Sequence, residues 1–289
     1  SSGTVLLTAS VNPNHLPVET TFANNVMSRN VTFQPTNPLK IELIKVRHHE
    51  GPGRGTSCGQ DVEPTDKDLD KVESALRREL PASKFVFTRR ANVWDSGLTL
   101  DCAINIAPGV ETGMVLKALE AAYASAPLDR IRLAIFARDF IGGAANDIPG
   151  WFAVVGWAAT LESSAHEIGH TLGRYHIASP STPPCKATSQ PVGLDSRYPY
   201  LPGGLIGGPV SDPERFMGFD RGDASLLPWP LPRKVVPPTV GDRMGYCEES
   251  WPSDYTWTGL REGINAKFSP NDPTGDFLRI TGSVDSLQT

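Results

Sequence analysis

Eleven consecutive residues near the middle of the 289-residue chain constrain its structure more than any other feature. They run from His166 to His176 and read HEIGHTLGRYH, with histidines at the first, fifth and eleventh positions. Residues four apart on a helix lie one turn apart on the same face, so His166 and His170 can direct ring nitrogens to one ion. Glu167 would lie beside that face, close enough to bind water near the metal without being a ligand. The stretch therefore predicts a metal-binding helix.

A third ligand six residues after His170 cannot reach the same ion if the helix continues. Gly173 resolves this, because glycine adopts the left-handed conformation that ends a helix and turns the chain back. His176 then completes a set of three histidines that leaves a fourth position open for water. Three protein ligands with an open position are typical of catalytic rather than structural zinc. We therefore expect one catalytic Zn2+ per chain, bound by His166, His170 and His176.

A purely structural interpretation of Glu167 competes with this one. Ser164-x-x-Glu167 also fits a capping box, in which Glu167 would only stabilise the start of a helix. Thr160 is an equally good cap and would begin the helix one turn earlier, which favours the metal-site interpretation.

Charge and hydropathy exclude several classes of partner. The net charge of −5 offers no electrostatic reason to expect nucleic acid or an anionic membrane as a partner. No apolar run approaches the roughly 18 residues that a transmembrane helix needs. The first residues, Ser1-Ser2-Gly3, show no signal-peptide pattern, so we expect any export signal to be missing from this sequence already.

Alternating strand-like and helix-like segments predict an α+β fold, in which helices pack on a mixed sheet. The expected strands are 39–46, 84–94, 131–137 and 151–157. The expected helices run from Thr65 or Asp66 to about Leu80, from about 113 to 126, from about 161 to 172 and from 253 or 254 to about 268. Residues 177–240 contain many prolines and glycines and few periodic segments, so we expect loop-rich structure there.

The two ends of the chain differ from this pattern. Residues 1–38 contain two strand candidates, 4–11 and 31–33, and no expected helix. They are either the tail of a preceding β-rich domain or an N-terminal extension lying on the next domain. Residues 269–289 are expected to form a linker, and 277–282 resembles the first strand of a following domain.

The four cysteines, Cys58, Cys102, Cys185 and Cys247, allow three complete pairings. None belongs to a CxxC motif or a Cys/His cluster. Two disulfides in an exported protein are one interpretation, and buried free thiols in a cytosolic protein are the other.

The pattern from His166 to His176 resembles the zinc signature of the metzincin metallopeptidases. The resemblance implies a zincin-like catalytic domain over residues 39–268. Its upper subdomain, 39–173, would hold a twisted mixed sheet with helices, and its loop-rich lower subdomain, 174–268, would follow the zinc-binding helix. Between them would lie a cleft, where an edge strand within about 143–157 holds the substrate in extended form.

The family also requires a tight turn whose methionine lies beneath the zinc ligands. Met244 in Gly241–Cys247 is the better candidate, and Met217 is the second one. Tyr246, two residues after Met244, would ligate zinc at rest or hydrogen-bond the oxyanion, although a buried structural tyrosine remains an alternative. With these two subdomains we expect the disulfides Cys58–Cys102 in the upper one and Cys185–Cys247 in the lower one, because each pair then stays on its own side of the cleft and ties a long loop to a framework segment.

Segments 242–247 and 251–256 and Tyr198-Pro199-Tyr200 resemble exported, multidomain bacterial metzincins, whereas 177–184 reads as an insertion. The implied function is a zinc endopeptidase, with Glu167 as general base. Its substrate would be an extended peptide or protein, with glycoproteins as one candidate class, and the enzyme would be secreted or at the cell surface within a larger chain. An inactive zinc-containing adhesion or carbohydrate-binding module, and a non-peptidase hydrolase, are the alternatives.

Overall fold

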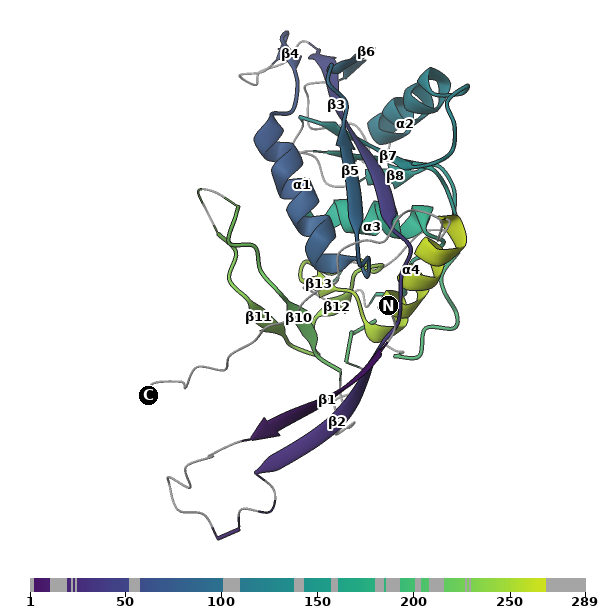
Figure 1. The fold of residues 1–289 in the computed structure, drawn as a ribbon. Helices are drawn as coiled ribbons and strands as arrows, with labels where there is room; N and C mark the ends of the chain where they lie inside the picture. Colours follow the sequence, from purple (N-terminus) through teal and green to yellow (C-terminus); the bar gives the residue numbers. More distant parts are fainter. Residues whose placement is uncertain are drawn as a thin grey trace.

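The computed structural model describes residues 3–10, 20–21, 23, 25–51, 58–100, 110–137, 143–156, 161–179, 185, 193–200, 204–207, 216–226, 228 and 230–268. Within these residues, a seven-stranded mixed sheet and four helices form the body of the protein (Figure 1). The α+β class predicted from the sequence is confirmed at this level. The expected linker and strand at 269–289 lie outside the described residues.

The sheet is built around one long central strand. Its strands are β3 (Leu39–Glu50), β4 (Asp61–Val62), β5 (Phe85–Arg89), β6 (Trp94–Leu100), β7 (Ile131–Phe136), β8 (Gly143–Ala145) and β9 (Phe152–Gly156). β3 pairs in parallel with β5 and then β6, and its other edge pairs in parallel with β7. β9 follows β7 in parallel, and β8 is antiparallel to β9 and ends the strand order. At the other end of the strand order β4 is antiparallel to β3, so the mixed sheet has a short antiparallel strand at each end of that order.

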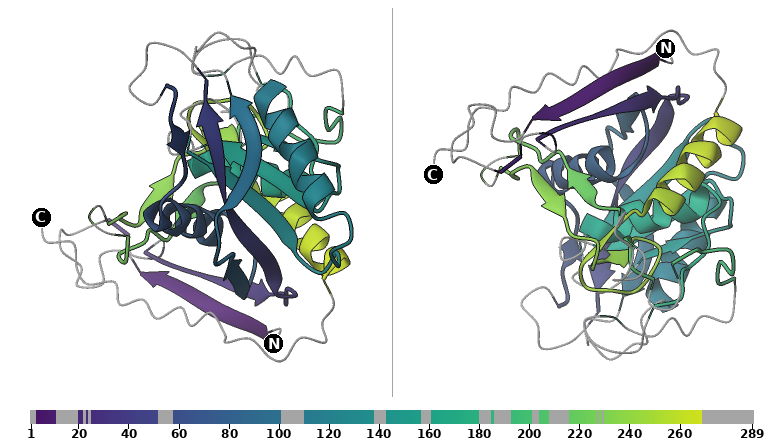
Figure 2. Two further views of the ribbon diagram at one scale, coloured as in Figure 1. Left: turned by 90° about the horizontal axis from the view of Figure 1, so that it is seen from above. Right: turned by 90° about the horizontal axis from the view of Figure 1, so that it is seen from below.

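Helices cover both faces of this sheet (Figure 2). They are α1 (Asp66–Glu79), α2 (Val110–Ala122), α3 (Leu161–Thr171) and α4 (Asp254–Lys267). Alternate side chains of β3, β7 and β9 point to opposite faces, as the two-residue period of a strand requires. One set packs with α1, α3 and α4, and the other set packs with α2. Because the middle strands are buried on both faces, β7 is apolar at every position except Arg132.

The helix ends follow local sequence signals. At the start of α1, the Asp68 carboxylate accepts hydrogen bonds from the backbone N–H and the hydroxyl of Thr65. Pro81 follows the C-terminal cap residue of α1, where the helix stops. Ser253 caps α4 by accepting the Thr256 N–H at 3.1 Å. Both helices therefore begin and end within one or two residues of the predicted positions.

Three sequence-based boundaries are wrong. The single strand expected at 84–94 is two strands, β5 and β6, which pair with successive parts of β3. The helix expected at 113–126 is α2, Val110–Ala122. β3 also continues past Val46, because its last residues pair with β4 and β6. There His48 and Glu50 are buried together, with a 2.9 Å contact between Nε2 and Oε1. Alternation of apolar and charged residues does not reveal such a buried polar pair.

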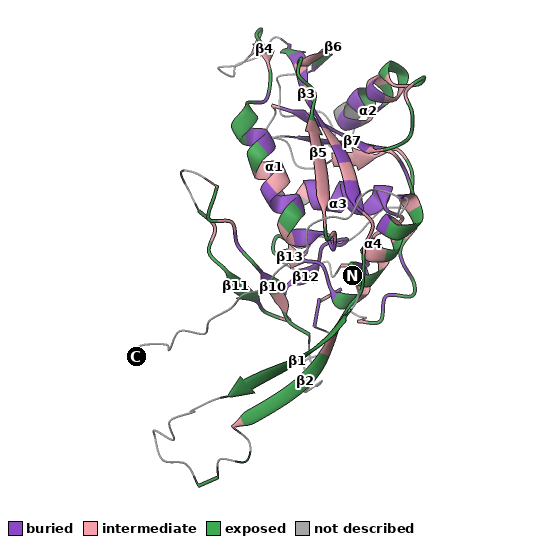
Figure 3. Ribbon diagram, in the orientation of Figure 1, coloured by how far each residue is buried: buried purple, intermediate pink, exposed green. Residues whose placement is uncertain are grey.

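The remaining strands form small two-stranded units. β1 (Gly3–Ser10) and β2 (Val26–Phe33) form an antiparallel hairpin that is exposed along almost all of its length (Figure 3). The lower half of the body holds β10 (Gly218–Asp220) paired with β11 (Lys234–Val236), and β12 (Gly241–Asp242) paired with β13 (Ser250–Trp251). None of the helices in the described part of the chain combines the length and apolarity needed to cross a bilayer.

Candidate metal centre

The side chains of α3 divide between the core and one polar site. Ala165, Ile168 and Leu172 pack into the main core beneath the sheet. His166 and His170 lie one turn apart, and their Nε2 atoms are 3.1 Å from each other. Because α3 begins at Leu161, Ser164 is inside the helix and cannot be its N-terminal cap. The capping-box interpretation of Glu167 is therefore wrong.

Gly173 turns the chain back toward this site. It has a φ of +90°, in the left-handed region that glycine occupies without strain. The N–H of Arg174 donates to the Gly169 carbonyl, and the N–H of Gly173 donates to the His170 carbonyl, at 2.9 Å each. These two bonds form a Schellman motif, which ends the helix sharply. The reversal returns His176 to α3, where its Nε2 lies 3.1 Å from that of His170 and 3.2 Å from that of His166.

Backbone carbonyls orient two of the three imidazoles. His166 Nδ1–H donates to the Arg243 carbonyl at 2.8 Å, and His170 Nδ1–H donates to the Arg174 carbonyl at 2.7 Å. A carbonyl only accepts, so each Nδ1 carries the proton and each Nε2 keeps a lone pair. Metal-binding histidines are usually oriented in this way by a second hydrogen bond.

The three converging Nε2 atoms fit a single cation. Ligands about 2.0–2.1 Å from one tetrahedral ion lie about 3.3–3.4 Å apart, close to the separations of 3.1 to 3.2 Å among these atoms. Burial lowers the pKa of His166 and His170, and burial with the nearby His170 charge lowers that of His176 to about 4. The rings are therefore neutral near pH 7, and the Nδ1–H bonds of His166 and His170 leave the Nε2 lone pairs of these two rings available to a cation. His166, His170 and His176 are thus close enough to hold a metal ion, as predicted.

Glu167 is next to this cluster and almost fully buried. Its burial raises the pKa of its carboxyl group to about 8. A Cβ added to Gly143 would lie 2.5 Å from Glu167 Cγ and 2.8 Å from Glu167 Oε1. The carboxyl group therefore lies directly against the backbone of β8, the last strand of the sheet. A cation at the histidines would favour the ionised carboxylate.

Met244 lies beneath the same helix. The Gly245 N–H donates to the Asp242 carbonyl at 2.9 Å, and Asp242 Oδ1 accepts the Met244 N–H at 2.8 Å, which together form a tight turn. Met244 is fully buried, and a Cβ added to Gly169 of α3 would lie 2.6 Å from its sulfur. Met217, the second candidate from the sequence, is 64% exposed and cannot have this position.

Tyr246 brings a hydroxyl group to the three histidines. Its oxygen lies 2.9 Å from His176 Nε2, and its ring stacks on that of His166 with centroids 5.8 Å apart. Burial, with a further contribution from the Glu167 charge, raises the pKa of Tyr246 to about 12. The hydroxyl therefore keeps its proton at neutral pH and can donate a hydrogen bond there.

Two residues that orient the site have no sequence signature. Arg174 pairs with the buried Asp195 at 3.1 Å, and Asp195 also accepts the Tyr255 hydroxyl at 2.8 Å. The Asp195 N–H donates to the His176 carbonyl at 2.8 Å. This group fixes the segment between His170 and His176. Neither Arg174 nor Asp195 occupies a fixed position of a spacing pattern, so the sequence does not mark them as site residues.

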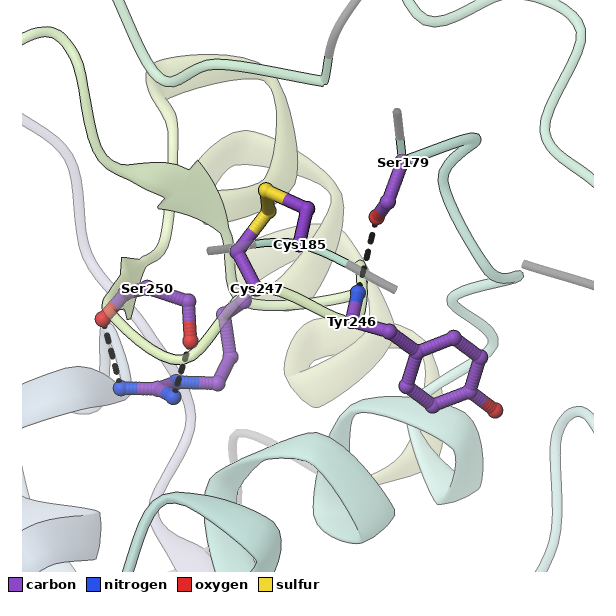
Figure 4. Close-up of a disulfide and its surroundings, with 6 residues drawn as sticks. Ser179, Cys185, Tyr246, Cys247 and Ser250 are labelled. Carbon is purple, nitrogen blue, oxygen red and sulfur yellow. Dashed lines mark hydrogen bonds between the residues drawn. A yellow bond between two sulfur atoms is a disulfide. The ribbon is translucent and has the colours of Figure 1, made fainter. Parts of the chain in front are cut away.

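A disulfide joins the segment after His176 to the turn at Met244. Cys185 pairs with Cys247, as predicted, and the Tyr246 N–H donates to Ser179 Oγ at 2.8 Å (Figure 4). Cys58 is also disulfide-bonded, and its expected partner Cys102 lies outside the described residues. The disulfide and the hydrogen bond hold the backbone of Tyr246 on both sides.

Removing the Cys185–Cys247 disulfide should destabilise the protein. The two cysteines are 62 residues apart in sequence, and cross-linking a loop of that length stabilises a fold by about 4 kcal/mol in the chain-entropy description. The variant Cys185→Ala/Cys247→Ala should therefore unfold at a clearly lower urea concentration than wild type. An unchanged unfolding midpoint would show that this disulfide does not contribute to stability.

Comparisons with known proteins add little to this geometry. No protein-family model matches the chain, and no match was found among curated proteins. One similar solved structure is described as "Structure of a chaperone-substrate complex". The alignment covers 83% of this chain and 39% of that one, with 11% identity and a TM-score of 0.31. A similarity with this TM-score supports no inference about fold or function, so the proposed function is based on the residues of the site.

Proposed function

We propose that this chain is a zinc-dependent endopeptidase of the metzincin type with a zincin-like fold. The observation that carries the proposal is the convergence of three imidazoles, two from α3 and one from the segment after it, beside the buried carboxyl group of Glu167. The tight turn with Met244 beneath α3 supports the family assignment. Three histidines and an open position suit a zinc ion that acts in catalysis.

The proposed chemistry is hydrolysis of a peptide bond. Zinc bound by His166, His170 and His176 would polarise the scissile carbonyl and lower the pKa of a water molecule toward neutrality. The Glu167 carboxylate accepts a proton from the attacking water and later returns it to the leaving amine. The Tyr246 hydroxyl, beside the histidine cluster, donates a hydrogen bond to the developing oxyanion.

The proposed substrate is an extended peptide held along β8. Among the residues that the structure describes, this strand pairs with β9 alone and is last in the strand order, so its other edge can pair with an added strand. Gly143 of β8 lies against Glu167, which brings a peptide on that edge close to the general base. A glycine here also leaves room for the carboxyl group.

An inactive zinc-containing adhesion or carbohydrate-binding module is the main alternative. Such a module would not need a carboxyl group beside the metal ligands, because it binds without proton transfer. Glu167 is almost fully buried, and burial without a cation raises its pKa to about 8. Burying this carboxyl group costs free energy in the metal-free protein. Such a cost is typical of a residue that acts in function rather than of one that only stabilises the fold.

We further propose that the enzyme acts outside the cytoplasm as part of a larger protein. The Cys185–Cys247 disulfide is compatible with an oxidising compartment. The exposed β1–β2 hairpin supports a neighbouring β-rich domain, since an isolated two-stranded hairpin is marginally stable in water. Extracellular proteins, glycoproteins among them, are the proposed substrate class.

The purified protein should contain about one zinc ion per chain and should cleave members of a peptide library. A chelator should abolish cleavage, and added zinc should restore it. Elemental analysis measures the metal, and mass spectrometry of the library identifies the cleaved bonds. Absence of a transition metal after gentle purification would contradict the metal centre. Metal binding without cleavage of any peptide would favour the binding module.

A further inference from the structure

The buried side chain of Arg243, next to the metal centre, donates hydrogen bonds to two other residues. Its Nε donates to Glu79 Oε2 at 2.6 Å, and only 4% and 2% of the two side chains are exposed. Its Nη1 donates to Ser250 Oγ at 2.6 Å, and its Nη2 donates to the Ser250 carbonyl at 2.9 Å (Figure 4). One guanidinium group therefore joins the last residue of α1 to β13.

The backbone of the same residue orients a metal ligand. The Arg243 carbonyl accepts the His166 Nδ1–H at 2.8 Å, and the Arg243 N–H donates to the Trp251 carbonyl at 3.0 Å. The side chain and the backbone of Arg243 are thus held by different partners. Loss of the side-chain contacts would therefore leave the carbonyl that orients the His166 ring held by the backbone contacts alone.

Stability alone is a poor explanation for this pair. Glu79 is the last residue of α1, where the partial negative charge of the helix end disfavours a carboxylate. Removing two charges from water also costs free energy that their attraction does not always recover. Such a pair is better explained by the one backbone conformation that it stabilises around Arg243. In that conformation the Arg243 carbonyl faces His166.

The geometry points to Arg243 and Glu79 as a positioning pair for the metal centre. Together they hold the Arg243 carbonyl where it keeps the proton on His166 Nδ1 and directs His166 Nε2 toward His170 and His176. They also connect α1, in the upper half of the domain, to the turn that contains Met244. This inference rests on the proposed metal centre.

The variant Glu79→Gln tests the pair, because glutamine keeps the shape of the side chain and removes its charge. Metal affinity should fall about tenfold, in the range typical of residues that orient ligands. Competition with a chelator measures this affinity for Zn2+, and the visible spectrum of the Co2+-substituted protein should also change. The double variant Glu79→Gln/Arg243→Gln leaves no unpaired buried charge and should show the same loss if the single variant folds poorly.

Arg78 offers a matched control on the same helix. It pairs with the buried Asp220 at 3.0 Å and joins α1 to β10. The variant Asp220→Asn should lower thermal stability and leave metal affinity and the Co2+ spectrum unchanged. Equal loss of metal affinity in both variants, or unchanged affinity in Glu79→Gln, would overturn the positioning role. Failure of the wild-type protein to bind metal in the same titration would instead contradict the metal centre itself.

Discussion

Replacing Glu167 with glutamine should remove nearly all peptide hydrolysis and leave the fold and the zinc content intact. Glutamine has almost the same size, so it fits against Gly143 of β8 as the carboxyl group does. It cannot accept a proton from the attacking water, and loss of a general base typically lowers kcat by about 10²- to 10⁴-fold. The zinc content should stay the same, because the proposed ligands are the three histidines and Glu167 is not one of them.

The measurement combines kcat, zinc content and melting temperature on one preparation. Glu262→Gln is a matched control, since Glu262 is an exposed glutamate on α4 and the chemical change is the same. This control should retain wild-type kcat. If Glu167→Gln keeps more than about a tenth of wild-type kcat with full zinc, Glu167 is not the general base.

The parts of the fold that could be predicted from sequence are those with local signals. α1 begins after Thr65 and ends before Pro81, and its buried residues recur at helical spacing. β5 and β6 were missed as separate strands, because each is defined by pairing with a different part of β3. The continuation of β3 to Glu50 also depends on tertiary contacts that a single sequence does not contain. Pairing between distant segments, rather than propensity, decided these boundaries.

The site shows the same division between local and distant information. Three histidines, Glu167 and Gly173 have a fixed local spacing, and the structure brings the histidines to one point. Arg243 and Glu79 are 164 residues apart in sequence, and no pattern links them. The hydrogen bonds that orient His166 and His170 go to backbone carbonyls, which every residue possesses. Sequence therefore predicts the ligands far better than it predicts the groups that orient them.

Tyr246→Phe should lower kcat by about ten- to a thousandfold and leave KM and zinc content almost unchanged. A well-placed hydrogen bond to an oxyanion is typically worth about 2.7–4 kcal/mol in the transition state, and less when another donor compensates. Phenylalanine keeps the ring that stacks on His166, and it removes only the hydroxyl 2.9 Å from His176 Nε2. The backbone bond from Tyr246 to Ser179 is also kept, so the ring should stay in place.

Tyr198→Phe separates catalysis from packing, because Tyr198 is a buried tyrosine in the cluster that contains Met244. Its hydroxyl donates to the Leu205 carbonyl at 2.9 Å and also lies 3.5 Å from Asp242 Oδ2, and neither of these partners is one of the three histidines. Loss of this bond leaves a carbonyl without its partner, so thermal stability should fall by about 1–3 kcal/mol while kcat stays near wild type. If Tyr246→Phe instead behaves like Tyr198→Phe, with lower melting temperature and unchanged kcat, Tyr246 is a structural residue. A selective loss of kcat at constant melting temperature is expected only when the hydroxyl acts on the reacting atoms.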